Sequence, residues 1–242
     1  MKVEMFNVGW ISSSAAVWRQ GEDPAERIRF PVPSYLIETA DERILIDTGL
    51  NPAAAADPAG FYGRPEAGMF ELEVEQDITE QLDVSTLTRI VLTHLHFDHV
   101  GALARLPASI PIVIQRREWE GGRDAATIAR NFFFPRDYAI DDRELVLVDG
   151  DHDLLGDGSI GLLSTPGHTP GHQSVRVGER LVLGADVAHF AGTLEDRRFP
   201  SFADDFAAQD RSASRLCELR EAGATIVPGH DPGVLTPGPV AT

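Results

Sequence analysis

The segment THLHFDHVG, residues 93–101, constrains the fold and the chemistry of this chain more than any other feature. It places three of the chain's eight histidines and one aspartate within six consecutive positions: His94, His96, Asp98 and His99. The segment overlaps the end of the apolar run RIVLT, residues 89–93, which predicts a buried strand. Residues two apart point away from each other on a helix but share one side of an extended chain. The spacing therefore favours a loop that wraps around metal ions over a helical face.

Three later segments supply side chains of the same kind. TPGHTPGH carries His168 on a turn rich in glycine and proline, LGAD ends at Asp186, and VPGHD contains His230. Each follows an apolar run, so several strand ends can converge on one rim, where the strands fix the positions of polar side chains. Neutral imidazoles suit zinc and neighbouring transition metals, and carboxylates can bridge two ions. The four segments together predict a metal centre.

The remaining sequence alternates between predicted strands and helices. Strands are predicted over residues 34–38, 43–47, 89–93, 110–114, 144–149, 159–165, 172–177, 180–186 and 225–228. Helices are predicted over residues 100–106, 116–130 and 204–222, and the acidic segment 71–83 fits a helix only in part. We expect one mixed α/β domain over residues 1–242, with helices covering the faces of its sheets.

Two aromatic regions, residues 9–33 and 131–140, fit none of these elements. Their rings include Trp18, Phe30, Phe132, Phe133 and Phe134. A loop rarely keeps so much aromatic surface without covering something. Two interpretations stay open. The rings complete the core or a homodimer interface, or they line an apolar substrate pocket.

The charge and the cysteine content exclude several classes of protein. A formal net charge of −17 would repel nucleic acid and anionic membrane surfaces, so neither is expected as a partner. No apolar stretch is long enough for a transmembrane helix, and the first residues lack the apolar core of a signal peptide. Cys217 is the single cysteine, so no internal disulfide can form, and a cytoplasmic location is the simplest expectation.

The metal-binding pattern resembles that of the metallo-β-lactamase superfamily over nearly the whole chain. The resemblance implies an αββα sandwich, in which two mixed β-sheets flanked by helices carry two divalent metal ions at one rim. It assigns the first ion to His94, His96 and His168, the second to Asp98, His99 and His230, and the bridging position to Asp186. Asp47, in the motif IDTG, resembles an aspartate that supports the metal-binding loop from behind, and His172 is expected to pack rather than to bind. Zinc is the expected metal, and iron, manganese and cobalt also suit these ligands.

Two longer motifs, TPGHTPGHQS and YLIETADERILIDTG, look like the N-acyl homoserine lactonase branch, whose members open the lactone ring of bacterial signals (quorum quenching). This resemblance implies two catalytic residues. Asp98 would carry a proton, and His189 would stand where those lactonases often have a tyrosine that contacts the substrate carbonyl. The alternative for His189 is a histidine that faces solvent. Other hydrolases with the same two-metal site stay open, acting on another ester, on a thioester as glyoxalase II does, or on an organophosphate.

Overall fold

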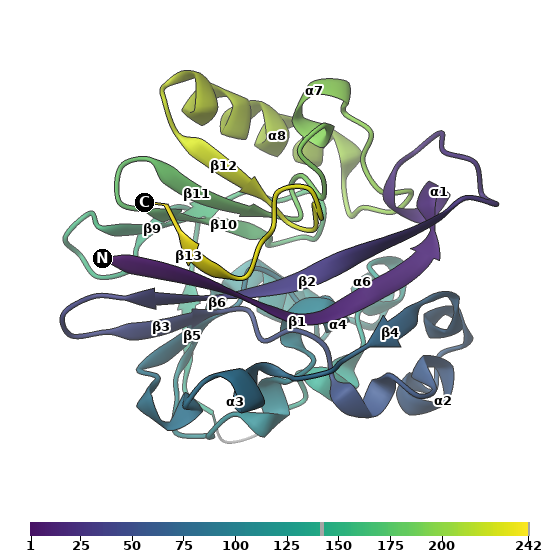
Figure 1. Cartoon of the computed structure of the whole chain (residues 1–242), viewed down its shortest axis with the longest axis horizontal. Coiled ribbons are helices and arrows are strands. Elements are labelled where there is room, and N and C mark those ends of the chain that lie inside the picture. Colours follow the sequence, from purple (N-terminus) through teal and green to yellow (C-terminus); the bar gives the residue numbers. More distant parts are fainter. Residues whose placement is uncertain (141–142, 242) are drawn as a thin grey trace.

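The computed structural model describes residues 1–140 and 143–241 and consists of two β-sheets packed face to face, with helices on their outer sides (Figure 1). The first sheet has the order β13-β1-β2-β3-β5-β6-β7, and β4 also pairs with β1. Its strands are β1 (Lys2–Ser14), β2 (Arg27–Glu38), β3 (Arg43–Ile46), β4 (Glu71–Glu73), β5 (Arg89–Val91), β6 (Ile112–Gln115), β7 (Leu145–Val148) and β13 (Gly238–Val240).

The second sheet has the order β12-β11-β10-β9-β8. Its strands are β8 (His152–Asp153), β9 (Ile160–Ser164), β10 (Gln173–Val177), β11 (Leu181–Ala185) and β12 (Thr225–Pro228). Both sheets are mixed, because β3, β5, β6 and β7 are parallel in the first and β11 and β12 are parallel in the second, while the other neighbours are antiparallel. The predicted αββα architecture is confirmed.

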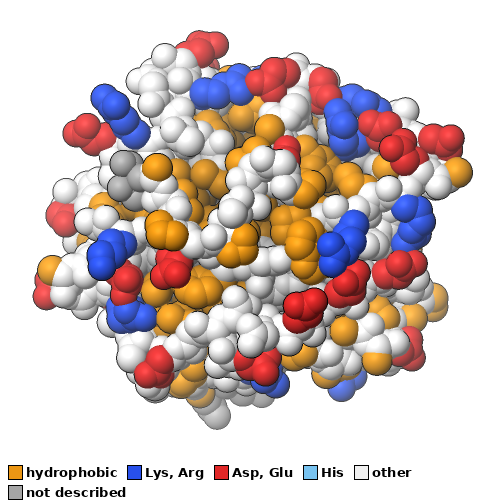
Figure 2. All heavy atoms as spheres, in the orientation of Figure 1, with side chains coloured by type: hydrophobic (Ala, Val, Ile, Leu, Met, Phe, Trp, Pro, Cys, Tyr) orange, Lys and Arg blue, Asp and Glu red, His pale blue; other side chains and the backbone are white. Residues whose placement is uncertain are grey.

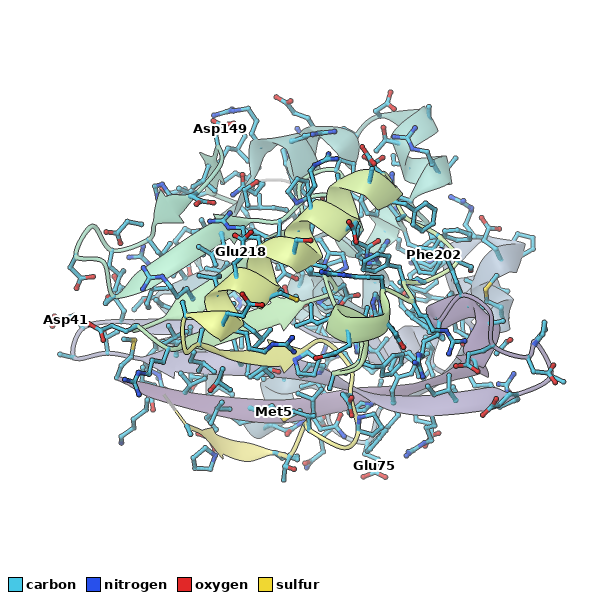
Figure 3. All side chains as sticks on the ribbon, turned by 90° about the horizontal axis from the view of Figure 1, so that it is seen from above. Met5, Asp41, Glu75, Asp149, Phe202 and Glu218 are labelled. Atoms are coloured by element: carbon cyan, nitrogen blue, oxygen red, sulfur yellow. The ribbon has the colours of Figure 1, made fainter. Side chains whose placement is uncertain are left out.

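The helices are short, apart from one. They are α1 (Ala15–Trp18), α2 (Pro58–Tyr62), α3 (Ile78–Gln81), α4 (Phe97–Val100), α5 (Arg116–Gly121), α6 (Ala125–Arg130), α7 (Thr193–Asp196) and α8 (Phe206–Glu221). Asp205 caps α8 by accepting a hydrogen bond from the Ala208 amide at 2.9 Å. In Figure 3, which looks down on α8, the helix runs across the second sheet, with Glu218 near its C-terminal end.

Apolar side chains fill the three spaces between these four layers. Between the two sheets lies a buried cluster that includes Ile37, Val91 and Val175. A larger cluster fills the space between the first sheet and α2–α6, and a smaller one, with Val182 and Leu216, joins the second sheet to α8. Successive strand residues face opposite sides, so a strand buried on both faces must be apolar throughout, as Ile44, Leu45 and Ile46 of β3 are.

The surface carries charged side chains of both signs (Figure 2). On the face shown in Figure 2, charged side chains of both signs surround an apolar central area, and the described residues form no continuous basic patch there. Within the described ranges, no helix combines the length and the apolar character that a membrane crossing requires.

The prediction for the N-terminal region was wrong. The sequence predicts no helix or strand over residues 9–33. In the structure, β1 and β2 form a long antiparallel hairpin that continues through about half of this range. Polar side chains of this hairpin contact residues of β4, and the sequence alone does not show that β4 lies beside the hairpin. Arg29 lies over the Trp10 ring at 3.9 Å and pairs with Glu73 at 2.9 Å.

Three helix predictions also differ from the structure. Residues 100–106, predicted as a helix, hold only the last residue of α4 and one 3₁₀ turn, Leu103–Arg105. The helix predicted over residues 116–130 is interrupted at Gly122, and α6 starts afresh where Asp124 accepts a hydrogen bond from the Thr127 amide at 2.8 Å. The segment 71–83 divides into β4 and the one-turn helix α3, because its first residues pair with β1. The sequence also missed the short edge strands β8 and β13.

Asp137 fixes the aromatic segment 131–140 against α2. Its carboxylate accepts hydrogen bonds from the Tyr62 hydroxyl at 2.8 Å and the Asn51 amide at 3.0 Å. Burial nevertheless raises the pKa of Asp137 to about 6. Because this pKa is higher in the folded than in the unfolded chain, ionisation of Asp137 destabilises the fold above pH 6. That cost, about 3 kcal/mol for such a shift, disappears as the pH falls below about 4.

An Asp137→Asn variant is therefore expected to gain stability relative to the wild type as the pH rises. The difference between their free energies of unfolding should change by about 2 kcal/mol from pH 4.5 to 7.5. Denaturant titrations of both proteins in excess chelator measure this difference without a contribution from metal binding. A difference that stays constant over the range would mean that Asp137 ionises at its ordinary pKa.

Candidate metal centre

The predicted metal-binding residues meet at one rim of the sandwich, just beyond the ends of β5, β9, β11 and β12. β9, β11 and β12 run in the same direction, so the segments that follow them start at the same edge of the second sheet. The segment after β5 approaches from the first sheet. His94 and His96 lie on the predicted loop, whereas Asp98 and His99 lie on the one-turn helix α4, because the His99 amide bonds to the His96 carbonyl at 2.9 Å.

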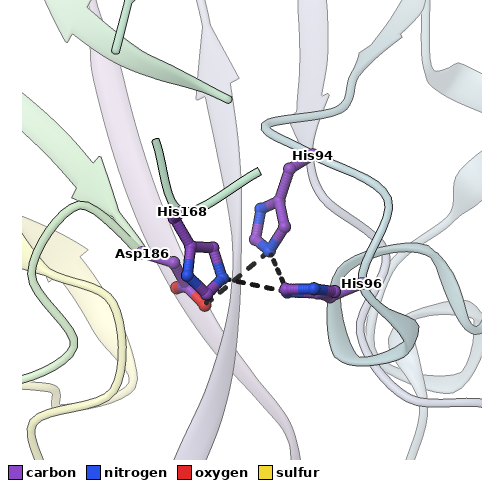
Figure 4. A group of neighbouring side chains, drawn as sticks. All are labelled: His94, His96, His168 and Asp186. Atoms are coloured by element: carbon purple, nitrogen blue, oxygen red, sulfur yellow. Dashed lines mark hydrogen bonds and ion pairs between the residues drawn. The ribbon is translucent and has the colours of Figure 1, made fainter. Parts of the chain in front are cut away.

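Four side chains form what we call the first cluster: His94, His96, His168 and Asp186 (Figure 4). Nδ1 of His96 lies 3.0 Å from Nε2 of His94 and 2.9 Å from Nε2 of His168. Oδ2 of Asp186 lies 3.7 Å from Nε2 of His94 and 3.3 Å from Nε2 of His168. Three nitrogens and one oxygen thus surround a common point.

The second cluster contains Asp98, His99 and His230. Nε2 of His230 lies 3.5 Å from Oδ2 of Asp98, and Nε2 of His99 lies 3.8 Å from the same oxygen. The other oxygen of Asp186, Oδ1, lies 3.2 Å from Nε2 of His230 and 3.5 Å from Nε2 of His99. Asp186 therefore stands between the clusters and turns one oxygen to each.

Hydrogen bonds on the far side of the rings orient these imidazoles. His96 donates from Nε2 to the Asn131 carbonyl at 2.7 Å, and His230 donates from Nδ1 to the Pro31 carbonyl at 3.0 Å. His99 donates from Nδ1 to Oδ2 of Asp47 at 2.7 Å. In each ring this bond holds a proton on the nitrogen that faces away from the cluster and directs the other nitrogen toward the cluster.

Asp47 lies behind the metal-binding segment, as its resemblance implied. Besides His99, it accepts hydrogen bonds from the amide and the hydroxyl of Thr93, both at 2.7 Å. His172 also lies behind the clusters, since its Nε2 accepts the Asp186 amide at 3.1 Å and its Nδ1 contacts the Thr165 hydroxyl at 2.9 Å. With both nitrogens engaged, His172 packs behind Asp186 and supports it.

Burial and the neighbouring carboxylates shift the pKa values of these histidines in opposite directions. It lowers the pKa of His96 to about 4 and the pKa values of His94 and His168 well below their ordinary range. Burial acts in the same direction on His99, but the carboxylates of Asp186, Asp47 and Asp98 outweigh it and raise the pKa of that ring. The first cluster thus offers neutral imidazoles, the form that binds metal ions.

The donor atoms fit a pair of metal ions. Four atoms at about 2.0–2.1 Å around a tetrahedral ion lie about 3.3 Å apart, close to the separations in the first cluster. Several buried atoms that face the clusters have no hydrogen-bond partner among the residues that the structure describes: Oδ2 of Asp98, Nε2 of His99, Oδ1 of Asp186 and Nε2 of His230. Buried polar atoms in proteins almost always have partners, so these four atoms suit bound cations.

His189 is buried at the same centre, so the alternative of a solvent-facing side chain is wrong. Its Nε2 lies 3.1 Å from Oδ2 of Asp186, and within the described part of the chain neither ring nitrogen has a hydrogen-bond partner. Its ring also contacts Trp18, with ring centroids 5.5 Å apart.

The aromatic residues predicted for the pocket pack around the histidines. Trp18 and Phe30 both lie against His230, and Phe133 lies against His96 at a centroid distance of 5.5 Å. Trp18 and Phe30 are buried within this chain, so their rings do not supply surface for a dimer. The homodimer itself stays a prediction. Phe134 is farther from the clusters and stacks on Tyr62 at 4.3 Å.

Sequence reasoning missed Phe202, which precedes α8 and is labelled in Figure 3. Its ring lies 5.8 Å from both His96 and His168 and 5.3 Å from the half-buried Phe132. No motif marks Phe202, because only the folding of the 197–205 loop over the centre brings it there. The sequence likewise gave no signal for the Asn131 and Pro31 carbonyls, since any residue could supply those acceptors.

Comparison with known proteins agrees with the geometry. Residues 27–234 match the sequence profile of the metallo-beta-lactamase superfamily. The N-acyl homoserine lactonase AttM of Rhizobium johnstonii is 31% identical over 221 residues, covering 84% of this chain and 82% of the relative. An N-acyl homoserine lactonase of a Bacillus species is 32% identical over 222 residues, covering 86% and 84%.

A solved structure extends the likeness to three dimensions. It is an N-acyl homoserine lactone hydrolase with its product, N-hexanoyl-L-homoserine, bound at the catalytic metal centre. It superposes with a TM-score of 0.84 at 26% identity, covering 96% of this chain and 94% of the other. With the profile match and the AttM relative, the chain belongs to the metallo-beta-lactamase superfamily.

Proposed function

We propose that the chain is a metal-dependent hydrolase that opens the lactone ring of N-acyl homoserine lactones. The observation that carries this proposal is the position of Asp186, whose two oxygens face two separate histidine clusters. A carboxylate so placed suits a pair of ions that share one substrate. The activities of the similar AttM and Bacillus lactonases support the choice of substrate.

In this proposal, His94, His96 and His168 hold the first ion, and Asp98, His99 and His230 hold the second, with Asp186 between them. Zinc is our proposed metal, because imidazole and carboxylate ligands suit it, and iron, manganese and cobalt are the alternatives. Two bound divalent ions would lower the pKa of a shared water and polarise the substrate carbonyl.

Asp98 is the residue that we propose moves the proton. Its Oδ2 is buried, faces the second cluster, and has no hydrogen-bond partner among the described residues. With one carboxylate oxygen on the second ion, the other oxygen of Asp98 would accept the proton that the attacking water releases and pass it to the ring oxygen when the carbon–oxygen bond breaks. The product is an N-acyl homoserine, with the added oxygen in its carboxylate and the transferred proton on its new hydroxyl group, and the second proton of the water is released to solvent.

We propose that His189 donates a hydrogen bond to the carbonyl oxygen of the substrate. The ring is buried, and among the described residues neither nitrogen has a hydrogen-bond partner, although Nε2 lies 3.1 Å from Oδ2 of Asp186. Trp18 and Phe202 contact histidines of the centre and Phe132 contacts Phe202, and we propose that these three rings receive the acyl chain. Phe30, Phe133 and Phe134, also predicted for the pocket, would act from behind by holding the histidines and the aromatic segment in place.

A His189→Phe variant is expected to lose a tenfold to hundredfold factor in kcat/KM. One hydrogen bond to developing negative charge is worth about 1.5–3 kcal/mol. His189→Tyr should retain most of the activity, because a phenol can donate the same bond. Steady-state kinetics on samples of equal metal content make the comparison. Wild-type kcat/KM in His189→Phe would exclude His189 from contact with the carbonyl.

A substrate panel on protein of measured metal content tests the proposed function. We expect N-hexanoyl and N-decanoyl homoserine lactones to be hydrolysed with kcat/KM at least about tenfold above simple lactones, thioesters and phosphotriesters, because an acyl chain adds apolar contact of about 1–3 kcal/mol. A thioester or a phosphotriester that outperforms every lactone would replace this function with one of the alternatives.

We further propose that the protein resides in the cytoplasm. Its single cysteine, Cys217, supports this location, because a reducing compartment does not favour disulfide-stabilised proteins. Fractionation of cells that express the full chain checks the location.

A further inference from the structure

Glu118 is a fully buried carboxylate that takes no part in the proposed chemistry. It lies on α5, and within the described residues it forms no ion pair with a basic side chain. Burial raises the pKa of Glu118 to about 7, although backbone amides lower it. A buried carboxylate costs folding free energy that an apolar side chain of similar size would not. Stability alone therefore does not explain a glutamate at this position.

The hydrogen-bond partners of Glu118 indicate its role. Oε1 accepts a hydrogen bond from the Leu95 amide at 2.9 Å, and Oε2 accepts one from the Gly171 amide at 2.7 Å. Leu95 stands between His94 and His96, and Gly171 follows His168 by three residues. One carboxylate therefore holds the two segments that contribute the three histidines of the first cluster.

These two segments come from different sheets. The segment with Leu95 follows β5 of the first sheet, and the segment with Gly171 follows β9 of the second. In the first cluster, Nδ1 of His96 and Nε2 of His168 approach to 2.9 Å across this boundary. The separation of the two segments therefore decides how well the three imidazoles surround one ion.

The packing around Glu118 leaves little freedom. A Cβ atom on Gly171 would lie 2.3 Å from the Glu118 backbone nitrogen, so only glycine lets the segment come this close. A second link, from the Gln173 amide to the Thr93 carbonyl at 3.0 Å, joins the same two regions independently of Glu118. The two sheets thus remain connected when the carboxylate is changed.

We propose that Glu118 is a positioning residue that sets the distance between the two histidine-bearing segments and thereby the metal affinity of the first cluster. The inference rests on the proposed function only for the assignment of His94, His96 and His168 to one ion. Two amide donors require two acceptor oxygens, which a carboxylate offers and a carboxamide does not. Glutamine would accept from one amide through its oxygen and turn its NH₂ group toward the other, so that this second amide and the NH₂ group facing it are left without acceptors.

The test compares Glu118→Gln with Glu120→Gln, which changes an exposed carboxylate on the same helix. Competition with a chromophoric chelator measures zinc affinity, and the visible spectrum of the cobalt-substituted protein reports the geometry at the ion. We expect Glu118→Gln to bind the first zinc 10–100-fold more weakly, as losses of groups that orient metal ligands do, and to show a changed cobalt spectrum. Glu120→Gln should match the wild type in both.

The outcomes separate this inference from the proposed function. Wild-type affinity and cobalt spectrum in Glu118→Gln, even with a lower Tm, would reduce Glu118 to a purely structural role while leaving the hydrolase proposal intact. A wild-type protein that binds metal but hydrolyses none of the panel would overturn the proposed function and leave the Glu118 test valid. A wild-type protein that binds no divalent metal would overturn both.

If Glu118→Gln does not fold, Glu118→Asp carries the test. It keeps the charge but is one methylene shorter, so its oxygens cannot reach both amides from the same backbone position. We expect weakened zinc binding there as well. Wild-type affinity in Glu118→Asp would contradict the proposal.

Discussion

Protein freed of metal by exhaustive chelation is expected to lose lactone hydrolysis by at least about a thousandfold, and readdition of zinc should restore it. The reason is that water at neutral pH is a poor nucleophile, and metal ions contribute several kcal/mol by lowering its pKa and stabilising the charge that develops on the carbonyl. The histidines and carboxylates around Asp186 are buried, so bulk solvent has little access to them.

Metal analysis and ring-opening rates on the same samples make this measurement. Titration with zinc should restore activity in proportion to occupancy and reach its maximum at two ions per chain. The matched control is wild-type protein carried through the same treatment with zinc-saturated chelator, which should stay active. Full activity in folded protein that holds no metal would contradict the proposed function directly.

Replacement of Asp98 by Asn is expected to lower kcat by a factor of about 100 to 10,000, the usual contribution of a positioned proton carrier. Asparagine keeps the shape of the side chain and one oxygen, but it cannot accept and return a proton. Oδ2 of Asp98 lies 3.5 Å from Nε2 of His230, so the change could also disturb the second cluster. The metal content of the variant must therefore be measured beside its rate.

The control for Asp98→Asn is Asp149→Asn, which alters an exposed carboxylate that pairs with Arg116 at 3.1 Å. Its kcat should equal that of the wild type. A low rate in Asp98→Asn that added zinc restores would assign Asp98 to metal binding alone. Near-normal turnover with both ions retained would remove Asp98 from proton transfer.

The parts of the fold that could be predicted were those with a local signal. The run before His94 and the buried strands of the second sheet are largely apolar, and burial on both faces requires that composition. β1 and the first part of β2 lacked such a signal, because Trp10 and Arg29 lie on a surface that is completed by Glu73 of β4. Their strand character depends on pairing between distant segments.

The aromatic residues show the same limit inside the centre. The three consecutive phenylalanines at residues 132–134 indicated a segment that packs against other parts of the protein or against a substrate. In the structure, however, the three rings have different environments. Phe133 packs against His96, Phe134 stacks on Tyr62, and Phe132 remains half-buried beside Phe202. Local sequence does not distinguish these roles, because each depends on which neighbour the fold supplies.

The sequence by itself determined the kinds of donor atom at the centre and their order along the chain, since the side chains needed to bind metal ions are few and their spacing after strands is distinctive. Only the tertiary structure decided that His189 is buried beside Asp186 and that Glu118 joins the segments of Leu95 and Gly171. The physical reason is that these relations are distances across the boundary between two sheets, and they are set by the packing of whole layers rather than by any local run of residues.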